Sequence, residues 1–370
     1  MTITEHHTQT PGRETLPWSW YSDPAILARE FERIFRRSWQ YVGHLGELQG
    51  PGSYFPSAGG PVPIVITLDR DGVLRGFINV CRHRGAIVAT EATSRGTLQC
   101  PYHGWTYGLD GCLRAAPRSG DDSAFDAGAR GLVPAAVGTW GPFVFANADP
   151  GAEPLSEALR DLPEIVAEHG LDVDGLRFRR RVHYEIRANW KIAIENYLEC
   201  YHCQINHPGL VDVLDERRLE LRAEGLRTSQ FAPINPRSLD GRGPFDANGE
   251  VGECQNHLWF PSMKFNVLPG HPNLSVGPVW PTGPETCAGY LDYWFGEDVD
   301  ERWIEELFEL DDQVGAEDTA LVEAAQRGTS AGLIDRGWVL GGAEMLIAHF
   351  QDFVRERLAL DQASGASSDH

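Results

Sequence analysis

The sequence predicts an α+β protein, in which a small all-β domain is followed by a larger domain of antiparallel sheet and long helices. Two patterns within the 370 residues support this prediction. Between Trp39 and about Asp149, short β-rich runs such as 62–68 and 143–146 are punctuated by Gly and Pro, as in small all-β domains. Beyond this region, strand-like runs alternate with segments whose apolar residues recur at helical spacing. At roughly 100–200 residues per domain, the length also favours two domains.

Each element follows from a local pattern. Asp23 and Pro24 are typical of a helix start, because Asp caps the first turn and Pro tolerates it. In the larger domain we expect helices at 155–169, 190–203, 301–328 and 341–358, and strands at 178–186, 256–265, 274–280 and 288–295. We place the domains at 1–38 (a helical segment packing on the larger domain), 39–150 (the β domain) and 151–360 (the larger domain). The Ser- and Gly-rich tail, 361–370, is expected to be disordered.

The composition excludes several functions. A formal net charge of −21 argues against nucleic acid as a partner, because phosphate binding needs clustered Lys and Arg. No apolar run approaches the roughly 18–20 residues that span a membrane, and the polar first residues do not resemble an export signal. Seven cysteines are an odd number and sparse for a secreted disulfide scaffold. We therefore expect a reducing cytoplasm, in which Cys paired with His indicates metal.

Four metal-binding residues fall in two short segments of the predicted β domain. Cys81 and His83 have the spacing C-x-H, and Cys100 and His103 have the spacing C-x2-H. Two thiolates and two imidazoles could bind tetrahedral zinc, or a [2Fe–2S] cluster with Cys on one iron and His on the other. The C-x-H half and the all-β surroundings disfavour a common zinc finger.

The two segments, CRHRG and CPYHGWTYGLDG, resemble the Rieske cluster motif of ring-hydroxylating oxygenase large subunits. The resemblance implies a [2Fe–2S] cluster, with zinc as the main alternative. Imidazole in place of thiolate on one iron raises the reduction potential to about −150 to +300 mV, from about −400 mV in all-Cys plant-type clusters. Such a centre accepts electrons readily. Cys112 lies just outside the motif and is expected to be a plain thiol.

A second pair of histidines, His202 and His207, is five residues apart. On an undistorted helix they would be rotated by about 140° from each other, so a helix must end between them. Pro208 supports this, because the residue before Pro avoids the helical region. The stretch Asn189–Pro208 resembles the mononuclear-iron segment of the same oxygenase family. That resemblance implies two His and one carboxylate on one face of Fe(II), with the opposite positions open for O2 and substrate.

The carboxylate ligand must come from elsewhere in the chain. The resembled proteins carry it on a late helix, and the matching segment here favours Asp318. Asp318 would share a helix face with apolar residues, where a carboxylate is costly unless paired or metal-bound. Periodicity does not separate it from Glu317, and Asp312 and Asp352 remain alternatives.

The resemblance also gives roles to residues around the second histidine pair. Glu199 stands where the family has an acid that bridges a cluster His and an iron-ligating His across subunits of a ring-shaped trimer. By that analogy Glu199 would link His103 of one chain to His202 of the next. Asn196 would stand near the iron without binding it. We expect Cys200 and Cys203 to be packing residues despite their C-x2-C spacing.

The implied protein is the terminal oxygenase of a multicomponent system, with an all-β Rieske domain and a helix-grip catalytic domain, an antiparallel sheet around a long helix. The sequence lacks a G-x-G-x-x-G dinucleotide fingerprint, so electrons must come from a separate NAD(P)H-dependent reductase, directly or through a ferredoxin. Arg82, Arg84 and Arg95 near the cluster loops could dock an acidic donor, although ordinary solvated arginines explain them equally well.

The substrate is suggested only by local similarity. The string ENYLECYHC looks most like the branch that oxidises choline, glycine betaine or carnitine-type quaternary ammonium compounds by hydroxylation or N-demethylation. Aromatic faces bind such cations, and seven aromatic residues could line a pocket, although most should be core: Trp259, Phe260, Phe265, Trp280, Tyr293, Trp294 and Phe295. The alternatives are an aromatic-ring hydroxylating (di)oxygenase, a non-catalytic Rieske electron carrier, and a helix-grip binding module.

Overall fold

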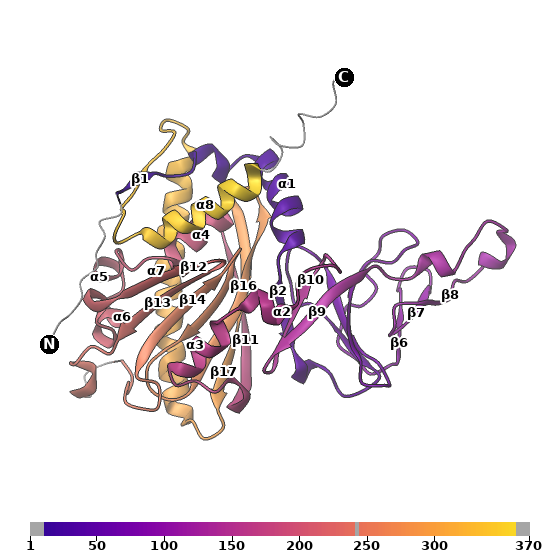
Figure 1. Cartoon of the computed structure of the whole chain (residues 1–370), viewed down its shortest axis with the longest axis horizontal. Coiled ribbons are helices and arrows are strands. Elements are labelled where there is room, and N and C mark those ends of the chain that lie inside the picture. Colours follow the sequence, from indigo (N-terminus) through magenta and orange to yellow (C-terminus); the bar gives the residue numbers. More distant parts are fainter. Residues whose placement is uncertain (1–10, 241–243, 360–370) are drawn as a thin grey trace. The chain divides into compact units, whose positions relative to one another are not determined.

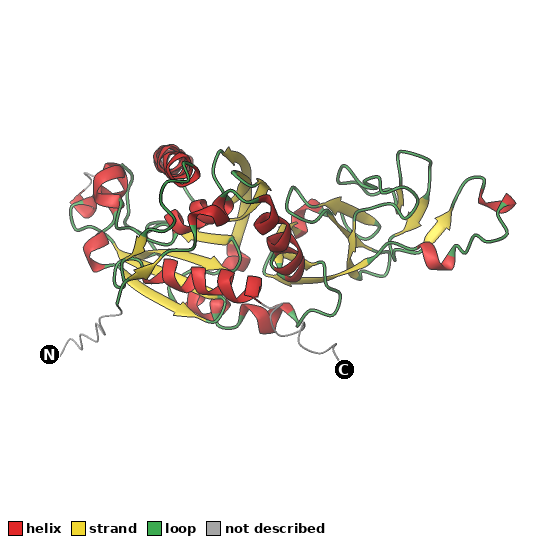
Figure 2. Cartoon of the chain, turned by 90° about the horizontal axis from the view of Figure 1, so that it is seen from above, coloured by secondary structure: helices red, strands yellow, loops and turns green. Residues whose placement is uncertain are grey.

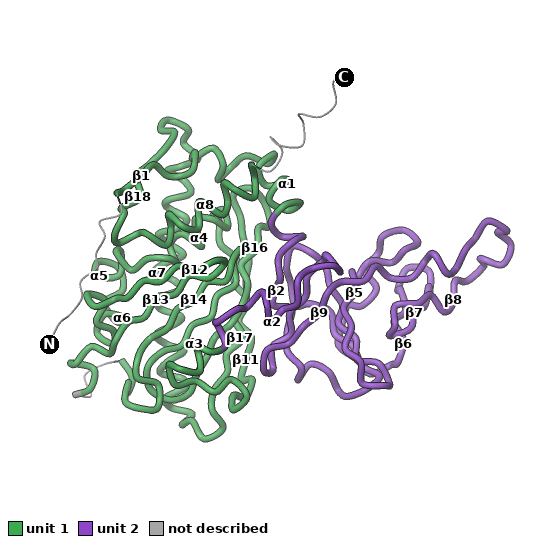
Figure 3. Tube along the Cα trace, viewed as in Figure 1, with its two compact units in different colours: residues 1–33, 164–370 green, residues 34–163 purple. Residues whose placement is uncertain are grey.

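The computed structural model describes residues 11–240 and 244–359, and the predicted disordered tail lies outside them. The chain divides into two compact units (Figure 3). One unit comprises residues 34–163. The other combines the described residues up to Arg33 with those from Glu164 onward.

The unit at 34–163 is built mainly of short strands. Its larger sheet has six antiparallel strands in the order β2-β10-β9-β5-β4-β3. In chain order these are β2 (Gln40–His44), β3 (Ser53–Pro56), β4 (Ile64–Leu68), β5 (Leu74–Ile78), β9 (Pro134–Trp140) and β10 (Phe143–Asn147). Aliphatic and aromatic side chains such as Val42, Phe55, Ile66 and Val144 form its core.

A second, three-stranded sheet in this unit positions the cluster loops. It consists of β6 (Thr97–Gln99), β7 (Thr106–Gly108) and β8 (Leu113–Ala115). Its core contains Leu98, Trp105 and Tyr107 together with the two predicted cysteine ligands. The sulfur atoms are thus presented from a packed interior rather than from a surface loop.

The predicted helix at 155–169 is two helices. α2 (Leu155–Leu159) and α3 (Leu162–Glu168) are separated by a break at Arg160, whose φ of 53° lies in the left-handed region. That conformation ends a right-handed helix. Helical periodicity continued across the break, so the sequence pattern alone did not reveal it.

The larger unit is organised around a seven-stranded antiparallel sheet in the order β11-β17-β16-β15-β14-β13-β12 (Figure 1). The strands are β11 (Leu176–Ile186), β12 (Glu220–Glu224), β13 (Arg227–Pro233), β14 (Glu253–Trp259), β15 (Met263–Val267), β16 (Asn273–Gly283) and β17 (Thr286–Gly296). The strand predicted at 256–265 is in fact the β14–β15 hairpin. Pro261 lies in the turn and has no N–H for a ladder hydrogen bond.

A 30-residue helix, α7 (Glu301–Ser330), lies along one face of this sheet (Figure 2). Asp300 caps it by accepting hydrogen bonds from the backbone N–H groups of Arg302 and Trp303. Trp303 and Phe308 then pack against sheet residues such as Phe295. This antiparallel sheet with a long helix confirms the predicted α+β class.

Shorter elements complete the larger unit. They are α1 (Pro24–Arg33), α4 (Trp190–Tyr197), α5 (Cys203–Asn206), α6 (Pro208–Val213) and α8 (Met345–Ala359), with a two-stranded pair of β1 (Arg13–Glu14) and β18 (Trp338–Val339). In the part of the chain that the structure describes, no helix has the length and apolarity needed to cross a bilayer.

Candidate metal centres

The two predicted cluster loops have the same backbone geometry. The Gly85 N–H bonds to the Cys81 carbonyl at 3.1 Å, and the Gly104 N–H bonds to the Cys100 carbonyl at the same distance. Both glycines have positive φ, 76° and 73°, which a residue with a side chain rarely adopts. Each loop therefore turns sharply just after presenting one Cys and one His.

The loops point their cysteines inward and their histidines outward. Cys81 and Cys100 are buried, whereas His83 and His103 are exposed. The two imidazole rings lie edge to face with centroids 4.5 Å apart. Burial, together with the neighbouring Cys81, raises the pKa of the Cys100 thiol. Paired sulfurs inside and paired imidazoles outside suit a [2Fe–2S] cluster with one thiolate-bound and one imidazole-bound iron.

Two aromatic residues support this candidate cluster site. The backbone N–H of Arg82 donates to the Tyr107 hydroxyl at 3.0 Å, and the same hydroxyl lies 3.3 Å from the Cys81 sulfur, to which it can donate. The His83 ring stacks on Trp105 with 7° between the planes. A thiolate would therefore receive a hydrogen bond, one of the factors that set the potential of an iron–sulfur centre.

The second histidine pair lies where the helix predicted at 190–203 is interrupted. The helix predicted at 190–203 ends at Tyr197, and a turn leads to the one-turn helix α5. His202 caps the start of α5 and His207 follows its end. As the spacing required, a helix ends between His202 and His207. That helix is the short α5, not the longer helix predicted from residue 190.

Asp318 of α7 completes a compact triangle of possible ligand atoms. His202 Nε2 and His207 Nε2 are 3.0 Å apart, His207 Nε2 is 3.0 Å from Asp318 Oδ1, and His202 Nε2 is 3.4 Å from the same oxygen. Neighbouring ligands of an octahedral ion with bonds of about 2.1 Å are about 3.0 Å apart. The three atoms thus approximate one face of an octahedron, as a facial triad requires.

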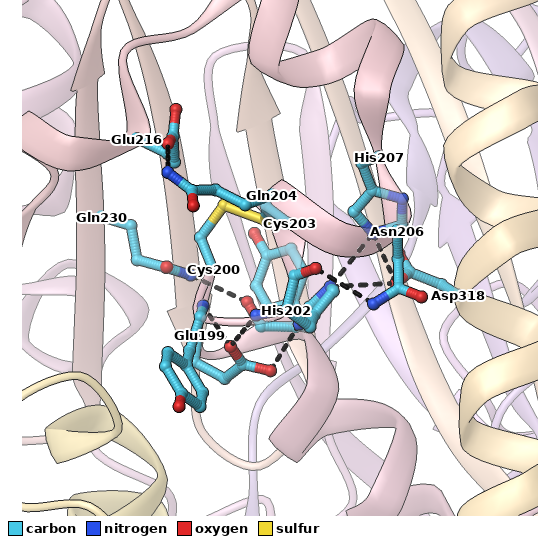
Figure 4. The surroundings of a disulfide bond; sticks show 12 residues. Glu199, Cys200, His202, Cys203, Gln204, Asn206, His207, Glu216, Gln230 and Asp318 are labelled. Carbon is cyan, nitrogen blue, oxygen red and sulfur yellow. Dashed lines mark hydrogen bonds and ion pairs between the residues drawn. A yellow bond between two sulfur atoms is a disulfide. The ribbon is translucent and has the colours of Figure 1, made fainter.

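A carboxylate holds the other nitrogen of each imidazole. Glu199 Oε1 lies 2.5 Å from His202 Nδ1 (Figure 4), and Glu317 Oε2 lies 2.7 Å from His207 Nδ1. Each carboxylate fixes its ring so that Nε2 faces Asp318. Such outer partners are typical of histidine ligands in metal sites.

This geometry separates the acids that periodicity could not. Glu317 lies behind His207 and has no oxygen in the triangle. Asp312 lines the same cavity, and Asp352 forms ion pairs with Arg13 and Arg355. Asp318 is therefore the acid that the arrangement favours as the third ligand.

The electrostatics of the triangle suit a cation. Burial lowers the pKa of His202, but hydrogen bonds with Asp318 and Glu199 outweigh this effect and raise the pKa to about 9. The pKa of His207 is raised by Asp318 and Glu317 against the same effect of burial. Burial opposes ionisation of Asp318, yet the two imidazoles hold its pKa well below the usual range. Protons and a metal ion compete for such a site.

Family models match both parts of the chain that carry these two centres. Residues 38–127 match the Rieske [2Fe–2S] domain, and residues 173–360 match the catalytic domain of the ring-hydroxylating alpha subunit. The chain belongs to the Rieske-type ring-hydroxylating oxygenases. Its domains bind a [2Fe–2S] cluster and a mononuclear iron, so zinc, a pure electron carrier and a binding module are set aside.

Relatives of this Rieske oxygenase are named for quaternary ammonium substrates. Chloroplastic choline monooxygenase of Spinacia oleracea is 31% identical over 366 residues, 96% of this chain and 81% of that protein. The carnitine monooxygenase oxygenase subunit of Acinetobacter pittii is 32% identical over 351 residues, 92% of this chain and 94% of that protein.

One solved structure supports the same family, and a second shares the fold. The quaternary ammonium Rieske monooxygenase CntA, in complex with L-carnitine, matches with a TM-score of 0.80 and 30% identity over 94% of this chain and 96% of that one. A naphthalene 1,2-dioxygenase from Rhodococcus, 20% identical with a TM-score of 0.76 over 94% of this chain and 95% of that one, shares the fold.

A disulfide beside the iron triad corrects one prediction. Cys200 and Cys203 are bonded to each other, with Cα atoms 4.9 Å apart (Figure 4), so they are not merely packing residues. The break after Tyr197 places Cys200 in a turn and Cys203 at the start of α5, within bonding range. The Cys203 sulfur lies within 4.8 Å of ring nitrogens of both histidines. As a disulfide sulfur it offers no thiolate to the metal.

The triad opens into a cavity of about 560 Å³ between the sheet and α7. This volume is in the range of small-molecule sites. Asn196 also lines it. Of the seven aromatic residues predicted as candidates, Tyr293 lines the cavity, and most of the others are core. Tyr184, Tyr197 and Lys264 also line the cavity and were not predicted from the sequence, although Val182, Tyr184 and Ile186 share one face of a recognisable strand.

Proposed function

We propose that this Rieske oxygenase hydroxylates or N-demethylates a quaternary ammonium compound. The observation that carries the proposal is the lining of the cavity. Its lining contains five acids, namely Glu199, Glu216, Asp311, Asp312 and Asp318, and the faces of tyrosines 184, 197 and 293. Acids and aromatic faces are the groups that attract a permanent organic cation. The names of the choline and carnitine monooxygenase relatives point to the same substrate class.

The residues around the iron have separate tasks in this reaction. His202, His207 and Asp318 would hold the metal by one face and leave the opposite positions to O2 and substrate. Glu199 and Glu317 would keep the imidazoles oriented. When bound, the iron activates O2 with electrons from the cluster. A substrate C–H becomes C–OH, the second oxygen atom leaves as water, and NAD(P)H supplies two electrons. An N-hydroxymethyl product then releases formaldehyde and the demethylated amine.

Electrons would reach the iron between subunits of a homotrimer. Glu199 is bonded to His202, and His103 is exposed at the tip of its loop. The proposal is that Glu199 of one subunit also accepts a hydrogen bond from His103 of the next. The structure of a quaternary ammonium Rieske monooxygenase, 29% identical to this chain, is described as giving insight into inter-subunit electron transfer.

A separate reductase, with or without a ferredoxin, would load the cluster, and the cytoplasm is the proposed compartment. Arg84 is exposed beside the cluster, with its guanidinium 5.2 Å from the centre of the Tyr102 ring. An acidic donor would be attracted to this positive charge. Reduction that is unaffected by salt and by Arg84→Glu would contradict the docking role.

The test of the function is turnover of the iron-loaded oxygenase with a reductase and a panel of betaines, choline and aromatic acids. We expect O2 uptake that depends on a quaternary ammonium compound, with formaldehyde or a hydroxylated product in proportion. A ring diol or phenol from an aromatic acid, with no reaction of the cations, would instead establish the ring-hydroxylating alternative.

A further inference from the structure

The chain contains only two lysines among 32 basic residues, and both lie inside the larger unit. Lys191 is fully buried, and its ammonium pairs with Glu30 at 2.6 Å. Lys264 belongs to β15 and lines the cavity beside the iron triad. The other basic residues of the chain are arginines. Lys191 thus has a carboxylate partner in the protein, and the surroundings of Lys264 can be compared with those of Lys191.

Lys264 is positioned by the alternation of its strand. Met263 and Phe265 are buried on the opposite face of the sheet, so Lys264 and Asn266 project into the cavity. The Lys264 ammonium lies 5.0 Å from the centre of the Tyr184 ring and 5.5 Å from that of Tyr197. The cation is thus held over two aromatic faces in the same space that contains the triad.

Lys191 has Glu30 as its ion-pair partner, whereas no carboxylate of the described residues lies within ion-pair distance of Lys264. The Tyr184 hydroxyl lies beside the ammonium, and it has no other hydrogen-bond partner in the part of the chain described. Burial lowers the pKa of Lys264, but Tyr184 and the negative charges of Asp311 and Asp318 together raise it above its ordinary value. An ammonium that stays charged in a cavity with one tyrosine hydroxyl beside it and no carboxylate partner is costly unless a ligand supplies further acceptors.

We propose that Lys264 binds a carboxylate of the substrate, so that the preferred substrate is a betaine, a molecule carrying both a quaternary ammonium and a carboxylate. This inference rests on the proposed function and narrows its substrate class. The ammonium end would meet the acids of the cavity, with a methyl group toward the triad. The carboxylate end would meet Lys264 and the hydroxyl of Tyr184. Choline has the first group but not the second.

A structural role for Lys264 makes a different prediction. Asp311 also faces the cavity, accepts a hydrogen bond from the Tyr293 hydroxyl, and has its pKa raised by burial. If Lys264 served only to balance Asp311, its loss would weaken all ligands alike. If it binds a carboxylate, its loss would weaken only ligands that carry one.

The experiment is calorimetric titration of the iron-loaded oxygenase with two matched pairs, glycine betaine against choline and γ-butyrobetaine against its methyl ester. We expect the acid of at least one pair to bind roughly tenfold or more tightly than its partner, as charge-assisted hydrogen bonds allow. Lys264→Met should remove this difference by weakening the acid, and Lys264→Arg should restore part of it. Asp311→Asn should weaken both members of a pair by the same factor.

Several results would overturn the inference. Equal affinity of the wild type for both members of each pair would do so while leaving the proposed function intact. So would an equal loss for both members in Lys264→Met, or a selective loss of the acid in Asp311→Asn. Absence of binding by all four compounds would overturn the proposed function as well.

Chemical labelling provides a second measurement that does not depend on a folded variant. Acetic anhydride applied to the native wild-type oxygenase should acetylate Lys264 far faster than Lys191, which is buried against Glu30. Mass spectrometry of the Lys264 peptide should show protection by the betaine of the tighter pair and none by its neutral-tailed partner. Equal protection by both would contradict carboxylate binding.

Discussion

The two metal centres are built in opposite ways. The four candidate cluster ligands lie between Cys81 and His103, on two loops with matching turns and hydrogen bonds. In contrast, the triad joins His207 to a carboxylate 111 positions later, on a different element. The cluster site can therefore be predicted from the local spacing of its ligands, whereas the iron site depends on how α7 packs against the sheet.

Because of this difference, the two centres should respond to different substitutions. The cluster cysteines belong to the packed core of their unit, so their positions follow from the small sheet. The iron site rests on a one-turn helix held by a disulfide and by two carboxylates on the rear of its histidines. Changes around the triad should therefore alter iron selectively, and changes around the loops should alter the cluster selectively.

The largest expected effect comes from the distant ligand. Asp318→Ala should lose the mononuclear iron and all oxygenation while keeping the visible spectrum of the cluster, lowering iron from about three to about two atoms per chain. Metal analysis and spectroscopy of the purified variant measure this. Glu323→Ala, on the same helix but paired with Arg187 away from the triad, is the matched control and should retain both metals. Full iron content in Asp318→Ala would discard the assignment.

Next in size is the proposed bridge between the two centres. Glu199→Gln should keep both metals but lower turnover by roughly 10–100-fold, because one imidazole loses its carboxylate partner and the electron path is interrupted. Stopped-flow reoxidation of the reduced cluster with substrate and O2 should slow by a similar factor. Unchanged reoxidation would show that electrons take another route.

Glu317→Gln sharpens the comparison between the two carboxylates. Glu317 contacts His207 on the side away from the metal, so its loss should weaken iron binding by roughly tenfold. At saturating iron, reoxidation of the cluster should remain near the wild-type rate, in contrast to Glu199→Gln. Competition with a chelator gives the affinity. A reoxidation defect at full iron loading would place Glu317 in the electron path.

A smaller effect is expected at the cluster itself. Tyr107→Phe removes the hydroxyl 3.3 Å from the Cys81 sulfur. Loss of a hydrogen bond to a cluster ligand should lower the reduction potential without loss of iron. A redox titration followed by visible spectroscopy measures the shift. Gln99→Ala, in the neighbouring strand, is a control that should leave the potential unchanged. A higher potential in Tyr107→Phe would contradict the donor role.

The smallest effect on activity is expected from Glu195, which supports the framework of α4. Burial raises the pKa of Glu195 to about 7, against the hydrogen bonds from Tyr21 and Gln351. The folded chain therefore keeps a proton that the unfolded chain loses from about pH 4.5 upward, so folding stability declines as the pH rises from about 4.5 to 7.

Glu195→Gln should remove this decline, because the amide is neutral at every pH. The variant should be more stable than the wild type at pH 8, by up to about 3 kcal/mol, and similar to it at pH 4.5. Denaturant unfolding at both pH values measures the difference. A variant that is less stable at pH 8 than at pH 4.5 by as much as the wild type would refute the role of this carboxyl group.

Much of the fold was predictable where local rules act alone. The helix at Pro24 and the strands near 178–186 and 288–295 were recognisable because capping and alternation are local properties. The predictions failed where a single backbone turn interrupts a continuing apolar pattern, at Arg160, after Tyr197 and at Pro261. The periodicity of apolar residues indicates which face of a helix or strand is buried. It does not reveal a break after which the same face stays buried.

The sequence by itself determined the family, the two cofactors and the candidate cluster ligands, because those ligands are close in the chain and their spacing survives any arrangement of the rest. Only the tertiary structure brought Asp318 rather than Glu317 into the triangle with both histidines, revealed the disulfide at Cys200, and placed Lys264 in the same cavity with no carboxylate of the described residues in ion-pair distance. The physical reason is that a ligand atom or an unpaired charge is defined by its neighbours in space. Here those neighbours come from strands and helices far apart in the chain.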